Sequence, residues 1–425
     1  MKKKEGGRLL SGAIVYLFSN ILNASIPFLL LPVLTRYLEP AEYGQVAMFQ
    51  LLISVLGAFV GLNTVGAANR KYFDMDSSQD MPQYIGACLQ VLFISLLAVF
   101  IFLYFFRNLL SEALGITSIW VILAAVASAA IFIVNLRLGQ WQVRKKPMKY
   151  GILQISLSIF NAVLSLLLVV ALSYGPEGRM LGQTFAPLAF SLLAIVLLAK
   201  DGLLSFSLRK DLIKDALRFG VPLIPHVGGA FLLFSIDRFF VKKYLGLESV
   251  GVYMAAAQLA MAISICFDAF NKAYVPWLFE RLKRNQQEEK NHIVKLTYGY
   301  FLLALLMAGV AFLLGPYLVV FIAGEKYAEA GSIIGLLALG QAFRGMYIMV
   351  TNYNFYSKST ALISLVTIFS GVVNLLLLIV LIPSVGLLGA AISNAISMLF
   401  MFLLAWLLAS FSYPMPWFSF GENRR

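Results

Sequence analysis

Apolar runs of about 20 residues recur along the whole chain, and each is long enough to cross the hydrocarbon core of a bilayer as a helix. Hydrophobic residues make up 60% of the sequence and charged residues only 12%, about half the charged share of a soluble domain. We therefore expect an all-α integral membrane protein with about twelve spans. The expected spans are residues 11–36, 44–68, 83–106, 117–141, 150–173, 179–199, 216–241, 249–275, 293–314, 331–353, 359–382 and 386–411.

Lysine and arginine are concentrated in alternate loops, and this bias indicates the orientation of the spans. With the N-terminus in the cytoplasm, the outer loops keep only Arg36, Arg107, Arg179, Lys242, Lys243 and Lys326. We therefore expect both termini in the cytoplasm. The first apolar run extends to Leu38, which is too long for a cleaved signal peptide. The net charge of +13 then reflects orientation, and no nucleic-acid partner is expected.

Two stretches of the chain, TRYLEPAEYG and KKYLGLESVG, resemble one another and indicate an internal repeat. At a constant offset of 207 residues the matched pairs are Tyr37 and Tyr244, Leu38 and Leu245, and Gly44 and Gly251. This offset corresponds to six helices, so the two copies would run in the same direction and be related by a pseudo-two-fold axis along the membrane normal. The repeat predicts two six-helix lobes, residues 1–205 and 206–425; a chance match of a few residues is the alternative.

The sequence offers no set of residues typical of an enzyme. Cys88 and Cys266 fall inside expected spans, and neither His226 nor His292 has a second ligand at metal-binding spacing. There is no Ser-His-Asp set, no paired carboxylates on one face and no phosphate loop. The outer loops are only a handful of residues long. We expect no catalytic activity, no metal and no cofactor.

The adjacent charges Asp237 and Arg238 stand at the end of the apolar seventh span. Neighbours on a helix project about 100° apart and cannot face each other, so one of them needs a partner on another helix or a place in a cavity. The structural alternative is that Arg238 extends to the lipid headgroups and Asp237 caps a helix.

Asp268 and Lys272 are four residues apart with the acid first, the order that favours an ion pair on one helix face. Pro276 is expected to end this helix, which places Lys272 about one turn from the cytoplasmic surface. A local ion pair and a role in a cavity are both compatible with this spacing.

Arg344 is the most deeply placed charge, and no acid lies within one turn of it. Gly340 and Gly345 would leave space beside its side chain, which favours a cavity. Arg70 closes the second span after the small and polar run GLNTVGAAN, a pattern that suggests a helix face beside an aqueous space. Anchoring at the membrane surface is the alternative for Arg70.

The first span contains Asn20, Asn23 and Pro27, and its repeat partner contains Pro222 and Pro225. Proline cannot donate to the carbonyl four residues earlier, so Pro27 would free the carbonyl of Asn23. Broken helices at corresponding positions of two repeats indicate a substrate or gating region. Kinks that serve only packing are the alternative.

Four stretches of the sequence resemble Wzx-type oligosaccharide flippases, in the polysaccharide-transport branch of the multidrug/oligosaccharidyl-lipid/polysaccharide (MOP) exporter superfamily, which includes the MATE transporters. They are FLLLPVLTRYLEPAEYGQVAMFQ (28–50), GLNTVGAANRKYFD (61–74), SIDRFFVKKYLGLESVGVYMAA (235–256) and FNKAYVPWLFERL (270–282). The resemblance extends over about residues 8–411 but does not name the sugar.

This resemblance implies two six-helix lobes around a cationic cavity and transfer of an undecaprenyl-diphosphate-linked glycan to the outer leaflet of the bacterial plasma membrane. Asp237 and Arg238 fall on the family's Asp-Arg pair, and Arg70 on its basic residue closing the second span. Lys272 and Arg344 are candidates from their expected burial alone. The predicted substrate-binding cations are thus Arg70, Arg238, Lys272 and Arg344, and the predicted polar or gating residues are Asn20, Asn23, Pro27, Asp237 and Asp268.

Partners implied by the resemblance are the lipid-linked glycan, membrane lipids, a polysaccharide polymerase and a chain-length regulator. The alternatives within transport are a lipid II flippase and a MATE-type multidrug antiporter. Drug exporters of the superfamily often carry an acid in the first span, where this chain has Asn20 and Asn23, and this difference disfavours the antiporter. A non-transporting scaffold of a polysaccharide-export complex is an alternative of a different class.

Overall fold

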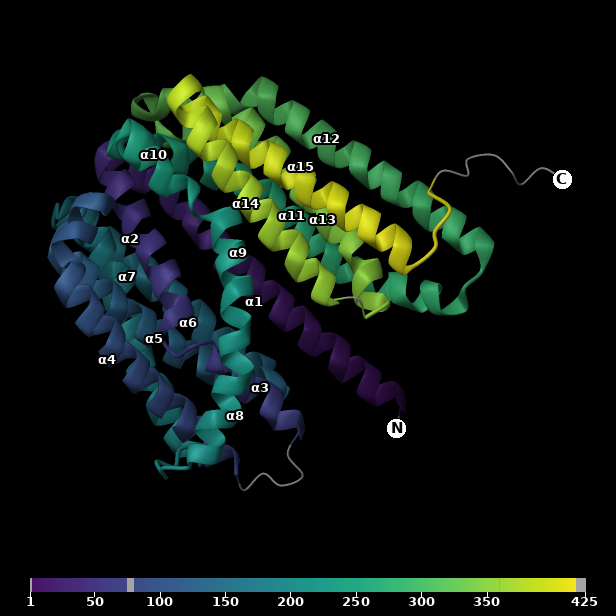
Figure 1. Ribbon diagram of the computed structural model, residues 1–425, viewed down its shortest axis with the longest axis horizontal. Coiled ribbons are helices and arrows are strands. Elements are labelled where there is room, and N and C mark those ends of the chain that lie inside the picture. Colours follow the sequence, from purple (N-terminus) through teal and green to yellow (C-terminus); the bar gives the residue numbers. More distant parts are fainter. Residues whose placement is uncertain (1, 75–79, 359, 418–425) are drawn as a thin grey trace. The chain divides into compact units, whose positions relative to one another are not determined.

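The computed structural model describes residues 2–74, 80–358 and 360–417, and every regular element in them is a helix (Figure 1). Among these residues, twelve helices or joined helices are long and apolar enough to cross a membrane, which confirms the predicted all-α, multi-pass fold. The elements are α1 (Lys2–Tyr37), α2 (Pro40–Phe59), α3 (Thr64–Asp74), α4 (Met81–Leu114), α5 (Ser118–Val143), α6 (Pro147–Leu166), η1 (Leu167–Ala171), α7 (Gly175–Lys200), α8 (Lys210–Gly220), η2 (Val221–Leu223), α9 (Ile224–Phe234), α10 (Asp237–Leu245), α11 (Leu247–Arg284), α12 (Gln287–Ala323), η3 (Glu325–Ala330), α13 (Gly331–Tyr356), α14 (Thr360–Val385) and α15 (Leu387–Ser412).

The chain forms two compact units. The first comprises Met1–Phe231 and Gly246–Gly251, and the second comprises Leu232–Leu245 and Val252–Arg425. By their contacts α8 and η2 belong to the first unit, so this division comes later in the chain than residue 205, where the repeat places the end of the first lobe.

In the first unit, α8 contacts the C-terminal end of α3 and the N-terminal end of α4. Lys71 of α3 forms an ion pair with Asp215 of α8 at 3.2 Å, and the Tyr84 hydroxyl of α4 donates to the same carboxylate at 2.9 Å. The amide of Ser205 donates to the carbonyl of Pro82 at 3.2 Å. The segment before α8 is therefore held against α4.

The second predicted span, residues 44–68, is two helices rather than one. Gly61, Leu62 and Asn63 all adopt positive φ between α2 and α3, a conformation that ends a helix and that glycine and asparagine tolerate best. The hydroxyl of Thr64 donates to the carbonyl of Gly61 at 2.7 Å and supports the turn. The break sets the direction of α3 separately from that of α2.

Two of three prolines behave differently from the sequence prediction. Pro27 lies inside the continuous helix α1, and Pro276 lies inside α11, which continues to Arg284. The expected break of the first span and the expected helix end at Pro276 are therefore wrong, because neighbouring helical hydrogen bonds sustain a long helix across one missing donor. Pro222 does interrupt its span, since it lies in the 3₁₀ turn η2 between α8 and α9.

The second unit encloses a core rich in aromatic and methionine side chains, contributed mainly by α11, α12, α13 and α15. Trp406 and Phe402 of α15 stack at 5.4 Å between ring centroids. The hydroxyl of Tyr298 of α12 donates to the carbonyl of Trp417, after α15, at 2.6 Å. This core holds α11, which carries Asp268 and Lys272, and α13, which carries Arg344.

The orientation predicts the result of reporter fusions. Alkaline phosphatase fused after Arg107, Pro176, Glu248 or Lys326 should be active, because each position falls at the end of a span expected to face outside. Green fluorescent protein at the same positions should stay dark. An internal signal at any two of the four would overturn the topology.

Candidate functional site

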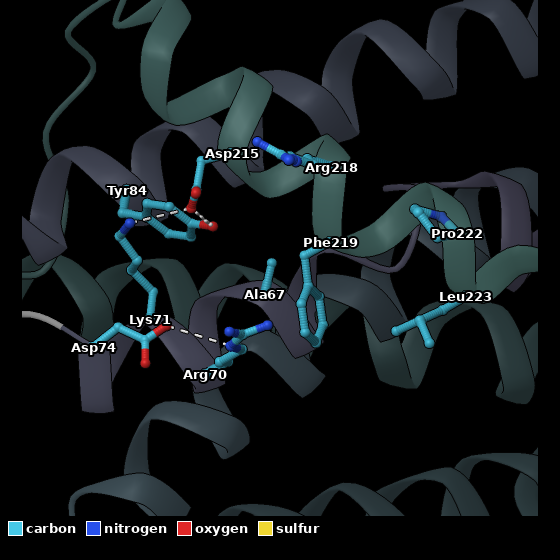
Figure 2. Close-up of a pocket in the computed structure, with 10 residues that line it drawn as sticks. All are labelled: Ala67, Arg70, Lys71, Asp74, Tyr84, Asp215, Arg218, Phe219, Pro222 and Leu223. Atoms are coloured by element: carbon cyan, nitrogen blue, oxygen red, sulfur yellow. Dashed lines mark hydrogen bonds and ion pairs between the residues drawn. The ribbon is translucent and has the colours of Figure 1, made fainter. Parts of the chain in front are cut away.

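A basic pocket of about 470 Å³ lies within the first unit, between α3, α4 and α8 and the turn that follows α8 (Figure 2). Its lining consists of Ala67, Arg70, Lys71, Asp74, Tyr84, Asp215, Arg218, Phe219, Pro222 and Leu223. Three of these side chains are cations and two are carboxylates, so the pocket carries a net positive charge.

The cations of the pocket differ in how firmly they are paired. Lys71 is directed at Asp215, which Tyr84 also binds (Figure 2). Arg70 forms an ion pair with Asp74 at 3.3 Å, but both side chains are more than half exposed, so this pair contributes little and is easily exchanged. Within the described chain Arg218 forms no ion pair, and its exposed guanidinium is available to an anion.

The amphipathic sequence of α8 explains how these side chains reach the pocket. Leu212, Ala216 and Gly220 repeat every four residues and are buried, which fixes that face of the helix. A Cβ at Gly220 would strike the carbonyl of Leu62, so glycine permits close contact with the turn before α3. The remaining side of α8 then presents Asp215, Arg218 and Phe219 to the pocket.

Arg70, a predicted substrate-binding cation, lines this pocket, and its surroundings add an aromatic contact. Its guanidinium carbon lies 5.4 Å from the ring centroid of Phe219, within the range of a cation–π interaction. Ala67, which belongs to the small and polar run GLNTVGAAN before Arg70, also lines the pocket. The sequence predicts an aqueous space beside this run.

A second cationic cluster lies in the second unit, where Arg344 of α13 meets α11. Its guanidinium donates to the hydroxyl of Ser264 and to both oxygens of Asp268, at 3.3 and 3.4 Å for the latter. Asp268 is thus paired with Arg344 and not with Lys272, so the local ion pair is ruled out. Lys272 is exposed and leaves the cluster with one net positive charge.

The two glycines near Arg344 do not open a space for it. A Cβ at Gly345 would strike the ring of Phe267, and one at Gly340 would strike the side-chain oxygen of Asn394. Both glycines therefore permit helices to pack closely, which corrects the prediction that they leave room beside Arg344.

Asp237 and Arg238 are the first two residues of α10, and their contacts are with one another and with Tyr253. Asp237 is 5% exposed and accepts hydrogen bonds from the Tyr253 hydroxyl at 2.5 Å and from the backbone amide of Arg238 at 2.8 Å. The Arg238 Nε atom lies 4.0 Å from the Asp237 carboxylate. Asp237 therefore satisfies one amide in the first turn of α10 and joins this helix to Tyr253 of α11.

The asparagines of the first span join α1 to α6. The side-chain oxygen of Asn20 accepts from the Tyr150 hydroxyl at 3.4 Å and from Gln154 at 3.3 Å, and that of Asn23 accepts from Ser158. The three donors are spaced every four residues on α6, so they form one polar stripe. Pro27 is exposed on the same continuous helix.

Two arginines are buried in the first unit, and one of them, Arg179, is placed by the predicted orientation in an outer loop. Arg137 is fully buried and pairs with Asp201, and its guanidinium holds the pKa of that carboxyl below the ordinary value. Arg179 is buried and donates to Asn161 and Ser165, each at 2.6 Å. The signal in the sequence for the Arg137 pair is Asp201 itself, because it is the first acid after Glu177.

Residues 9–282 match the family described as "Polysaccharide biosynthesis protein". The chain belongs to this polysaccharide biosynthesis family. The match includes α3, α8 and the basic pocket, and in the second unit it reaches Asp268 and Lys272. It ends before Arg344.

Relatives in this family align over nearly the full length of the chain. The Haemophilus influenzae protein "Lsg locus putative protein 1" is 26% identical over 398 residues, covering 90% of this chain and 95% of its own. The Staphylococcus aureus "Capsular polysaccharide biosynthesis protein CapF" is 24% identical over 400 residues, covering 90% and 94%.

Solved structures of transporters share the fold of this polysaccharide biosynthesis family member. An inward-facing multidrug resistance MATE transporter of the MOP superfamily aligns with a TM-score of 0.68 at 19% identity, over 94% of this chain and 98% of its own. The lipid II flippase MurJ in an inward closed conformation aligns with a TM-score of 0.71 at 15% identity, over 95% and 87%. The predicted MOP/MATE-like fold is confirmed, and it is common to both transport alternatives.

Proposed function

We propose that this protein transfers an undecaprenyl-diphosphate-linked oligosaccharide from the inner to the outer leaflet of the bacterial plasma membrane by alternating access. The glycan would be a repeat unit of an O-antigen, capsule or exopolysaccharide, to be joined by a polymerase and a chain-length regulator. The protein itself would break no covalent bond, so it is a transporter and not an enzyme.

The observation that carries this proposal is the basic pocket between α3 and α8 in a member of the polysaccharide biosynthesis family. A diphosphate carries about two negative charges, and moving such an anion across a bilayer without partners costs several kcal/mol or more. Arg70 and Arg218 can each present a planar fork of donors to phosphate oxygens. The weak pair of Arg70 with Asp74 can be replaced by the ligand at little cost.

The cluster at Arg344 supports a second position for the same diphosphate, on the other unit. Asp268 holds the Arg344 guanidinium through the Nη2 nitrogen alone, and the exposed Lys272 adds a point charge on α11. The basic pocket and the Arg344 cluster each carry one net positive charge. Neither would bind a diphosphate tightly, which suits a substrate that has to be released again. Arg238 is proposed as a third, weaker contact near the exit.

Substitution of the pocket cations tests the proposal. Arg70→Gln with Arg218→Gln should lower the flipping rate of a fluorescent prenyl-diphosphate-linked oligosaccharide in proteoliposomes by roughly ten- to a hundredfold, the usual loss for hydrogen bonds to a charged group. The same loss is expected for Arg344→Gln with Lys272→Gln, whereas Arg344→Lys should retain part of the activity. The control, Lys283→Gln with Lys295→Gln, removes two exposed cations of the second unit that lie outside the basic pocket and outside the cluster at Arg344.

Normal flipping by both well-folded double variants would refute the proposal. Flipping of lipid II in preference to other lipid-linked glycans would favour the lipid II alternative, and proton- or sodium-coupled efflux of a cationic dye would favour the antiporter. Loss of the protein from the membrane in the Arg70 and Arg218 variant would indicate a structural role for those cations.

A further inference from the structure

An apolar groove of about 650 Å³ lies between α2 and α4 of the first unit, and α8 closes one of its ends. The side chains that define it are Val55 and Phe59 of α2, Ala98 and Phe102 of α4, and Ile213 and Leu217 of α8. Ala98 and Phe102 are exposed, so the groove is open along its length.

A second depression, of about 740 Å³, lies on α8 itself and is partly basic. Ile213 and Leu217 line it together with Lys210, Lys214 and Arg218. Because Ile213 and Leu217 line both features, the apolar groove leads directly to the cations.

The cations of α8 form a single row at the end of the groove. Lys210, Lys214 and Arg218 are four residues apart, so they follow one stripe of the helix, and all three are exposed. Among the described residues neither Lys210 nor Lys214 takes part in an ion pair. A row of free cations next to an apolar channel complements a ligand with an anionic head and a hydrocarbon tail.

We infer that this surface binds one anionic phospholipid, with its phosphate on Lys210 and Lys214 and an acyl chain in the groove between α2 and α4. Most of the groove's α4 side chains fall between Val91 and Leu103, about 18 Å of helix. One leaflet of hydrocarbon is about 15 Å thick, so a single acyl chain matches this length. With the expected orientation, the lipid belongs to the inner leaflet.

The position of the lysines separates this site from that of the transported substrate. Lys210 and Lys214 are absent from the lining of the basic pocket in Figure 2, which α8 bounds with Asp215 and Arg218. A lipid here would hold α8 against α3 and α4 without occupying the pocket. The inference therefore does not depend on what the protein transports.

Native mass spectrometry of the purified full-length protein tests the site. With palmitoyl-oleoyl phosphatidylglycerol and phosphatidylcholine offered together, the protein should retain one phosphatidylglycerol in preference. Lys210→Gln with Lys214→Gln should lower that affinity roughly tenfold, as expected for two interfacial lysines. The control, Lys145→Gln with Lys149→Gln, removes two exposed cations predicted on the same side of the membrane and should bind as the wild type does.

A second variant tests the groove without altering charge. Ala98→Trp fills the groove and should also reduce phosphatidylglycerol binding, whereas Leu313→Trp on the exposed surface of α12 should not. Equal retention of both lipids by the wild type, or an equal loss in the control variants, would overturn the inference. Displacement of the lipid by millimolar inorganic phosphate would reduce the site to a phosphate site. Preferential binding of a C55 prenyl diphosphate would assign the groove to the carrier lipid and likewise overturn it.

Discussion

Asp201→Asn is expected to lower the free energy of unfolding by about 3 kcal/mol or more, the usual cost of leaving one member of a buried ion pair without its partner. The side chain of Arg137 is 1% exposed, and its Nε and Nη1 atoms have no hydrogen-bond partner in the described structure. Its guanidinium carbon lies 4.0 Å from the centroid of the Trp141 ring. Asp201 is therefore the principal group that compensates this buried charge.

Thermal unfolding of the detergent-solubilised protein measures the effect. Glu280→Gln is the control, because it removes an exposed pair with Arg284 and should cost at most about 1 kcal/mol. Equal stability of the two variants would show that Arg137 does not depend on Asp201.

The same pair predicts a dependence on pH. Because the pKa of Asp201 is lowered in the folded state, its contribution is complete above the ordinary carboxyl pKa, about 3.9, and is lost as the pH falls through the lower folded value. The stability difference between the wild type and Asp201→Asn should therefore be constant near neutral pH and shrink below about pH 4.

Hydropathy predicts where a residue lies along the membrane normal but not which neighbour it faces. The twelve spans follow from the sequence because a bilayer core admits only internally hydrogen-bonded helices. The partner of Arg344, by contrast, is Asp268 on another helix, and only the packing of α11 against α13 determines that pair. The pair of Arg137 with Asp201 is not visible in the sequence for the same reason, since α6 and α7 lie between the two residues.

The sequence predicts breaks in the helices only in part, because a glycine or a proline interrupts a helix at some positions and is accommodated at others. Gly61 and Asn63 both favour positive φ, yet the run that contains them was taken as a helix face, and the break between α2 and α3 was missed. Pro27 was expected to break α1 and does not. Pro222 interrupts its span. Sequence indicates where a helix can break, and the surrounding packing decides whether it does.

Gly44→Ala and Gly251→Ala are each expected to destabilise the protein by about 1–3 kcal/mol, the usual cost of overpacking a tight contact. A Cβ at Gly44 would overlap the carbonyl oxygen of Leu247, and one at Gly251 would overlap that of Pro40. Both obstacles are backbone atoms, which cannot move aside as a flexible side chain can. The first turns of α2 and α11 would have to separate.

Gly44 and Gly251 are also matched to each other by the repeat, at an offset of 207 residues. In the structure they are in contact, because a Cβ at Gly44 would lie only 3.2 Å from the amide nitrogen of Gly251. Gly57→Ala is the matched control, because it lies in α2 with no atom within 4 Å of its added Cβ and should be neutral or stabilising by up to about 1 kcal/mol. Since the two glycines share one contact, the double variant should cost less than the two single variants together. If the losses of stability in the two single variants add up fully in the double variant, or if Gly57→Ala loses as much stability as they do, the shared contact is contradicted.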